Sequence, residues 1–174
     1  MKERLMKCLK GLLPPGMDPK LLCGTFLAGL SISALGSLSF WWRYGLAVSR
    51  LYETVGGRRV RIPGEMMADF AALMGGADVT NALVCFWALA LLMPLFIIYH
   101  YLYHRQGARS DYLMRRLPNR WVYHRRCVVL PVAAGLAALA AAMLVLLLYF
   151  GMYMLFTPGD ALLPGQWMKI WSVI

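Results

Sequence analysis

The sequence predicts an all-α membrane protein with three transmembrane helices, an N-terminal amphipathic interfacial helix and a short cytoplasmic helix. Three observations support this fold class. Apolar residues make up 60% of the 174 residues and charged residues 15%, whereas soluble domains carry about 25% charged residues. Three uncharged apolar runs each reach the length of about 20 residues that crosses a bilayer. Basic residues gather between the second and third runs. We therefore expect a single membrane domain, 1–174.

The N-terminal segment 1–20 is predicted to form an interfacial helix and a linker. Within residues 2–13, the apolar residues share one helical face and the basic residues occupy the others. Such a basic amphipathic helix lies in the membrane surface. Pro14, Pro15 and Pro19 then interrupt the pattern before the first apolar run.

Three spans are predicted from the uncharged runs at 21–42, 82–103 and 127–156. Pro94 lies inside the second span and should bend it without breaking it. The third span is longer than a perpendicular helix needs, which requires a tilt, a kink or a projecting end. The tail 157–174 is rich in tryptophan, so we expect it to lie on the outer membrane surface.

Small residues recur at intervals of four in the first and third spans. Such a stripe lets another helix approach closely, so we assign both stripes to helix packing. The alternative is that small residues merely dilute a lipid-facing helix. The predicted packing residues are Gly29, Ser33, Ser37, Ala134, Ala138 and Ala142.

The outer loop 43–81 is predicted to contain a hairpin and a short helix. Residues 52–62 form two short runs around Gly56 and Gly57, which tolerate the positive φ of a tight turn. Residues 65–74 have the apolar spacing of an amphipathic helix. A structural lid is the role we expect for this loop, and a gate for substrate exit is the alternative.

The loop 104–126 fixes the predicted orientation. It carries seven arginines and one acidic residue, a net charge of +6. Basic side chains resist translocation, so this loop is predicted to be cytoplasmic. The N-terminal twenty residues carry +3, the loop 43–81 carries +1 and the tail carries 0. We therefore expect the N-terminus inside and the C-terminus outside. Membrane lipid is the partner that this charge predicts, because no nucleic-acid signature accompanies it.

Familiar catalytic signatures are absent from the sequence, including the phosphate loop, the serine nucleophile elbow and the paired-histidine zinc motif. We therefore expect no enzyme activity, no catalytic residue and no cofactor. A metal site formed by His100, His104 and His124 is an alternative. Histidines beside tyrosines at this depth are more commonly headgroup-level residues, so we assign no metal ligand. No span contains a charged residue, which argues against a self-contained ion-coupled transporter.

A short helix is predicted within the basic loop. Ser110 can cap it, residues 111–117 have helical spacing, and Pro118 ends it. Asn119 can then start a helix whose residues 120–126 continue into the third span. The arginines of this loop, considered by themselves, are explained by their binding to lipid headgroups. A helix tied to two spans can also transmit movement from a cytoplasmic partner into the membrane.

This layout resembles a known family. An N-terminal surface helix, two spans, and a short helix ending in Leu117-Pro118-Asn119-Arg120 before the third span are similar to the front half of the permease subunits of bacterial ATP-binding-cassette (ABC) exporters. The resemblance covers roughly residues 1–156 and combines layout with a short, degenerate motif. In that family the corresponding Leu-Pro-x-x-Arg-like segment belongs to a coupling helix that docks on the ATPase. This chain has three predicted spans, fewer than a family subunit normally has.

The resemblance implies a function and a set of partners. ATP would be hydrolysed by a separate cytoplasmic ABC ATPase, and the small-residue stripes would pack against further helices of a homo- or hetero-oligomer. We expect an integral membrane subunit of an ATP-driven exporter in the bacterial cytoplasmic membrane. The alternative is a small membrane scaffold or regulatory protein with no transport activity. The implied partner-docking residues are Tyr112, Leu113, Arg116, Leu117, Pro118 and Arg120.

Overall fold

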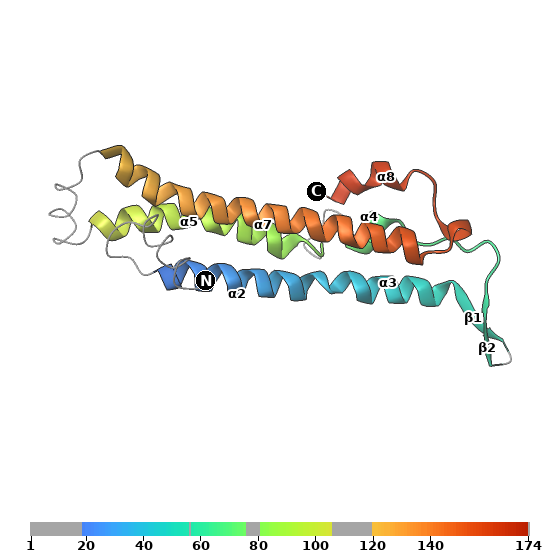
Figure 1. The fold of residues 1–174 in the computed structure, drawn as a ribbon. Helices are drawn as coiled ribbons and strands as arrows, with labels where there is room; N and C mark the ends of the chain where they lie inside the picture. The colour runs from blue at the N-terminus through green and yellow to red at the C-terminus, as the bar shows by residue number, and fades with distance from the viewer. Residues whose placement is uncertain (1–18, 56, 76–80, 106–119, 174) are drawn as a thin grey trace, which may run out of the picture. The chain divides into compact units, whose positions relative to one another are not determined.

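The computed structural model describes residues 19–55, 57–75, 81–105 and 120–173 (Figure 1). This part of the chain consists mainly of helices, with one two-stranded hairpin. The predicted interfacial helix at 2–13 lies outside the described residues, as does the predicted cytoplasmic helix at 111–117.

Three helical segments of the described chain are long and apolar enough to cross a membrane. Each of them overlaps one of the three apolar runs of the sequence, so the predicted helical fold with three helices of spanning length is confirmed. These segments are Lys20–Arg50, Val84–Leu102 and His124–Phe156.

The first helical segment continues beyond residue 42, where its predicted span ends. Helices α2 (Pro19–Ser37) and α3 (Ser39–Arg50) are separated by Leu38, whose own backbone is helical. The Leu38 N–H donates to the Leu35 carbonyl at 3.1 Å. The polar residues that end the apolar run do not end the helix, because backbone hydrogen bonds do not depend on side-chain polarity. Its 31 residues extend about 46 Å, against roughly 30 Å for a hydrocarbon core.

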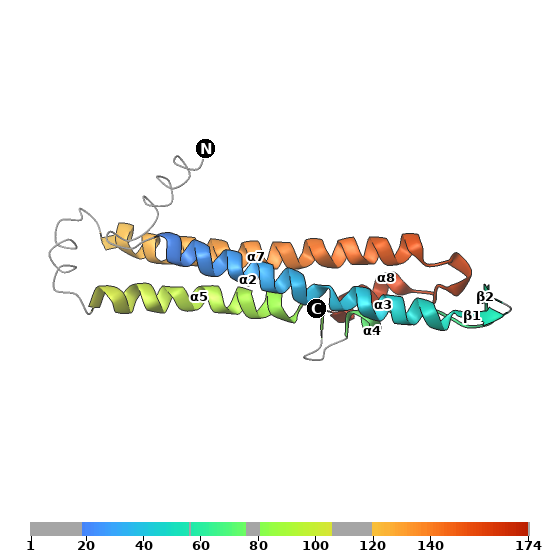
Figure 2. The same ribbon diagram turned by 90° about the horizontal axis from the view of Figure 1, so that it is seen from below.

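The other two long helices each contain a proline. Helix α5 (Val84–Arg105) continues through Pro94, and α7 (Arg120–Phe156) continues through Pro131 (Figure 1 and Figure 2). Apolar helices tolerate such prolines because neighbouring groups satisfy the freed backbone carbonyls. Helix α7 begins before the predicted span 127–156, as expected from a helix start after Asn119. Its 37 residues extend about 55 Å.

The predicted hairpin is confirmed. Strands β1 (Tyr52–Val55) and β2 (Arg58–Arg61) pair antiparallel, and Gly57 adopts a φ of 81° in the turn between them. A side chain at that position would be strained, which explains the glycine.

The predicted helix at 65–74 is shorter in the structure. Only α4 (Phe70–Met74) is helical, because Asp69 has an extended backbone with a ψ of 142°. The Met67 N–H donates to the Ala161 carbonyl at 2.9 Å. This long-range hydrogen bond holds the preceding residues in an extended connection, which amphipathic spacing cannot reveal.

The described residues form two compact units, and the first consists of those within Met1–Ser31 and Phe86–Ala141. Gly135 lets α7 approach α5 closely, since a Cβ at this position would lie 3.3 Å from the Ala90 carbonyl oxygen. Phenylalanine and leucine side chains surround a buried core contributed by both helices. That core is formed by Leu89, Ala90, Met93 and Ala138.

The second unit comprises Ile32–Cys85 and Ala142–Ile174, and an aromatic cluster forms its centre. The Phe40 ring stacks on the Tyr149 ring with their centroids 4.6 Å apart. The Phe70 ring meets the Phe40 ring edge-on, with their centroids 5.9 Å apart. Helices α3, α4 and α7 of this unit therefore share one apolar core.

The tail after α7 forms three short helical segments. They are η1 (Gly159–Ala161), α8 (Gln166–Lys169) and η2 (Ile170–Val173). Trp167 and Trp171 are exposed, while the opposite side of the tail is buried against the rest of the second unit. Their predicted position on the outer membrane surface stays a prediction.

The packing of Ala138 gives a direct test of the first unit. Replacing this fully buried residue with leucine should overpack the contact with α5 and lower the free energy of unfolding by about 1–3 kcal/mol. Ala137→Leu is the matched control, because the neighbouring Ala137 is exposed. Thermal unfolding in detergent, followed by loss of monodisperse protein, measures both variants. Equal midpoints for the two variants would contradict this core assignment.

Candidate functional site

The predicted docking segment cannot be placed within the described residues. Five of its six residues precede the start of α7, and for Arg120 only the backbone is described. The five that lie outside the described residues are Tyr112, Leu113, Arg116, Leu117 and Pro118.

The predicted helix-packing residues are distributed over both units. In the second unit, Ser33 and Ser37 are 1% and 3% exposed, and the Ser37 hydroxyl lies 3.0 Å from the Tyr149 hydroxyl. Ala142 of the same unit is also buried. In the first unit, Gly29 faces the Leu89 side chain. Packing of these stripes against a partner's helices stays a prediction.

The remaining two members of the stripes lie on α7 in the first unit. Ala138 is fully buried and Ala134 is half-buried. Both pack at the same core, so close helix packing within this chain occupies this part of the stripe.

Two of the histidines considered as metal ligands have other partners. The His100 Nδ1 atom lies 3.1 Å from the Cys127 carbonyl oxygen, and the His124 Nδ1 atom lies 2.7 Å from the Tyr101 hydroxyl. Among the residues that the structure describes, no three His, Cys, Asp or Glu side chains cluster as metal ligands would. The His104 side chain lies outside the description.

A polar network joins the tail to the start of α4. The Asp69 carboxylate accepts hydrogen bonds from the Lys169 ammonium at 2.8 and 2.9 Å and from the Gln166 amide at 3.1 Å. Gln166 in turn accepts a hydrogen bond from the Phe70 N–H at 3.2 Å. The hydrogen bonds from Lys169 and then Gln166 lower the pKa of Asp69 below its ordinary value of 3.8.

A second connection uses Asn81, a buried residue just before α5. Its side-chain amide donates to the Val173 carbonyl at 3.1 Å, and its side-chain oxygen accepts from the Leu83 N–H at 2.8 Å. One amide side chain therefore bonds both the backbone immediately before α5 and the backbone of the tail at Val173.

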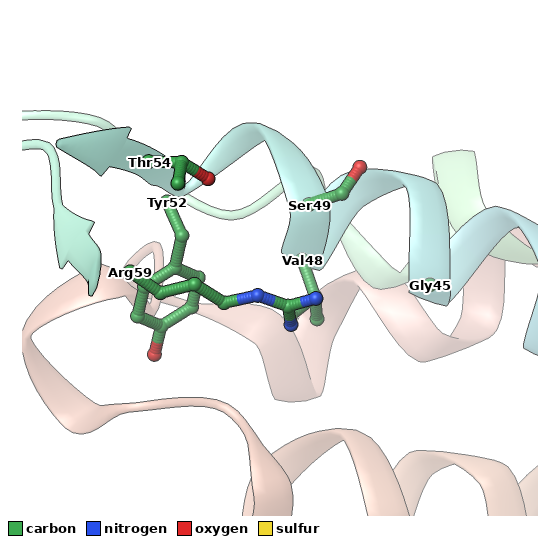
Figure 3. A pocket seen from close by; sticks show the side chains of 6 residues that line it. All are labelled: Gly45, Val48, Ser49, Tyr52, Thr54 and Arg59. Carbon is green, nitrogen blue, oxygen red and sulfur yellow. The ribbon is translucent and has the colours of Figure 1, made fainter. Parts of the chain in front are cut away.

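A polar pocket lies between α3 and the hairpin, and we consider it as a candidate ligand site (Figure 3). Its volume is about 460 Å³. Figure 3 shows the Arg59 side chain reaching from β2 toward α3, with its guanidinium beside Val48. The lining residues are Gly45, Val48, Ser49, Tyr52, Thr54 and Arg59.

An apolar pocket adjoins the polar one and shares Val48 and Tyr52 with it. Its volume is about 290 Å³. The nearby Tyr44 hydroxyl lies 3.4 Å from the Thr157 hydroxyl, so its polar end is directed to the end of α7. The lining residues are Trp41, Tyr44, Val48, Leu51, Tyr52, Phe156 and Pro158.

The hairpin register explains why the polar pocket is positively charged. Thr54 is paired with Arg59, and Tyr52 is paired with Arg61. Because side chains alternate along a strand, these four residues share one face of the hairpin, while Glu53 belongs to the other face. Sequence reasoning predicted the hairpin but not the pocket, since the helical wall comes from the continuation of α3 to Arg50.

Comparisons with protein-family models, curated proteins and solved structures give no match to this chain. The chain is a mostly helical protein whose three long apolar helices are compatible with a multi-pass membrane protein.

Acidification should weaken the Asp69 network. Because the folded-state pKa is lowered, this carboxylate stabilises the fold fully above 3.8 and loses its contribution as the pH falls through the folded-state value. Asp69→Asn should cost less than about 1 kcal/mol at neutral pH, since the pair is partly exposed and screened. Thermal midpoints of the wild type and variant should differ near pH 7 and converge below pH 3.8.

Asp160→Asn is the control for this measurement. Its side chain is 92% exposed and lies 3.4 Å from the Arg61 guanidinium, so its removal should leave the midpoint nearly unchanged. A gap between the wild type and Asp69→Asn that stays constant into the acidic range would contradict the proposed electrostatic contribution.

Proposed function

We propose that this chain is an integral membrane subunit of an ATP-driven, ABC-type exporter that couples a separate cytoplasmic ATPase to membrane helices. The observation that supports it is the continuity of α7 from Arg120 to Phe156. This helix starts directly after the segment with the coupling-helix resemblance. A displacement of that segment by a docked ATPase would therefore act on a single helix of about 55 Å.

The composition of the spans supports an external energy source. Residues 21–42, 82–103 and 127–156 contain no Asp, Glu, Lys or Arg. Buried ionisable groups are what proton- and ion-driven transporters use in their membrane helices. A subunit without them depends on a partner for energy, and nucleotide hydrolysis by a cytoplasmic protein is the source that the coupling-helix resemblance suggests.

The proposed location is the bacterial cytoplasmic membrane, with the N-terminus and the loop 104–126 inside. The arginine-rich loop supports this orientation, because positive charge is retained on the cytoplasmic side. At the start of α7, Arg125 is exposed and Arg126 is half-buried, so at least one guanidinium is available to lipid headgroups. The hairpin and the tail are then on the outer side.

A second candidate function is a membrane scaffold or regulatory protein without transport. The observation that favours it is that close contacts expected between subunits also occur within the chain. Gly29 faces Leu89, and Gly135 faces the Ala90 carbonyl. When the small-residue faces of helices pack against other helices of the same chain, fewer partner helices are needed to cover them.

The docking prediction separates the two functions. The tagged full chain, solubilised in mild detergent, should recover a cassette ATPase with ATPase activity in the eluate. Leu117→Asp should reduce this recovery by about tenfold or more, because a carboxylate in an apolar contact is strongly unfavourable. Membrane levels of the variant should equal those of the wild type. Recovery is quantified by mass spectrometry of the eluate.

Ser110→Asp is the matched control, because it adds the same charge to the same loop outside the docking residues. It should leave recovery unchanged. Equal recovery with Leu117→Asp would overturn the coupling role of the segment. Recovery of the chain alone, or with a partner that lacks ATPase activity, would favour the scaffold.

A further inference from the structure

The two pockets beside α3 are ordered along the helix by polarity. The apolar pocket begins at Trp41, at the end of the predicted span 21–42. The polar pocket begins one turn later, at Gly45, and extends to Arg59 on the hairpin. Val48 and Tyr52 belong to both. An apolar surface therefore starts next to the hydrophobic span and leads to a cationic surface farther along α3.

The charge of the hairpin residues indicates which chemical group the polar pocket can bind. None of its lining residues is acidic, and Arg59 is exposed. Arg61 on the same face is paired at 3.4 Å with Asp160. Glu53 lies on the opposite face of the hairpin, because it alternates with Tyr52 and Thr54. Arginine, with hydroxyl groups from Tyr52 and Thr54 in the same pocket, suits a carboxylate or phosphate group.

The lining of the apolar pocket indicates that the other part of the ligand is a hydrocarbon chain. Its lining is mainly aromatic and aliphatic, and Phe156 and Trp41 retain substantial exposure in the described chain. Covering such surface with a hydrocarbon chain is favourable, because it removes apolar area from water. Its volume of about 290 Å³ and the 460 Å³ of the polar pocket lie close to or within the range of roughly 300–1,000 Å³ typical of small-molecule sites.

We propose that these adjoining pockets bind an amphiphile with an acidic head group and an acyl chain. Arg59 binds the acidic group, and Trp41, Tyr44 and Phe156 cover the chain. The hydrocarbon part points toward the span and the charged part away from it, which is the orientation of a lipid at a bilayer surface. This inference is independent of the proposed exporter function, because it involves neither the basic loop nor an ATPase.

The experiment is a titration of the purified full chain with oleate, followed by native mass spectrometry. We expect one saturable site. Oleyl alcohol, which has the same chain without the charge, should bind about tenfold more weakly. Acetate, which has the charge without the chain, should not compete. Dioleoyl phosphatidylglycerol distinguishes the source of the head group: tighter binding than oleate indicates a phospholipid, and weaker binding indicates a free acid.

Two variants test the site itself. Arg59→Gln should weaken oleate binding by about tenfold, whereas Arg58→Gln, on the opposite face of the hairpin, should not. Gly45→Leu should also abolish binding by filling the polar pocket. No atom lies within 4 Å of a Cβ at this position, and leucine favours a helix, so this variant should fold. Gly24→Leu is its control, because that position is equally open.

Several outcomes would overturn the proposal. Equal losses of oleate binding in Arg59→Gln and Arg58→Gln would show that the overall positive charge of the hairpin attracts oleate, without a specific role for Arg59. Equal binding of oleate and oleyl alcohol would leave an apolar groove without head-group recognition. Competition by acetate at oleate's own concentration would indicate a simple anion site. Unchanged oleate binding by a folded Gly45→Leu variant would place the ligand elsewhere.

Discussion

The length of two helical segments relative to the thickness of a bilayer is the constraint on which the rest of this structure depends. The segment Lys20–Arg50 and helix α7 extend about 46 and 55 Å, whereas a hydrocarbon core is roughly 30 Å thick. Turns that extend beyond an apolar layer have to cover their apolar faces with protein. In the second unit, Phe70 of α4 contacts Phe40 of α3, and the tail in turn packs against α4.

The same constraint connects the fold to the candidate ligand site. Because α3 continues to Arg50, its last turns stand beside the hairpin and supply one wall of each pocket. A helix that ended at residue 42 would leave Arg59 on an isolated two-stranded hairpin, which has little stability of its own. The cationic surface and the aromatic surface therefore exist side by side because a helix continues past its apolar run.

The sequence predicts the parts of this fold that depend on local chemistry. Uncharged runs identify the three long helices, and Gly56-Gly57 identifies the hairpin turn. Boundaries were less predictable, because Arg43 and its neighbours change polarity without ending backbone hydrogen bonding. The shortened α4 and the Asp69–Lys169 pair depend on contacts between residues about 100 positions apart, for which spacing gives no signal. The pockets could not be predicted either, because they depend on how α3 packs beside the hairpin and the end of α7. The docking segment remains a prediction from its motif and its place before α7.

Asn81 imposes an order on assembly. Its amide bonds to Val173, and the Phe70 N–H bonds to Gln166, so residues made early in synthesis obtain their partners from the last part of the described chain. Contacts of such long sequence separation form late, since the intervening chain has to be delivered first. The second unit is therefore complete only after all three long helices have been synthesised.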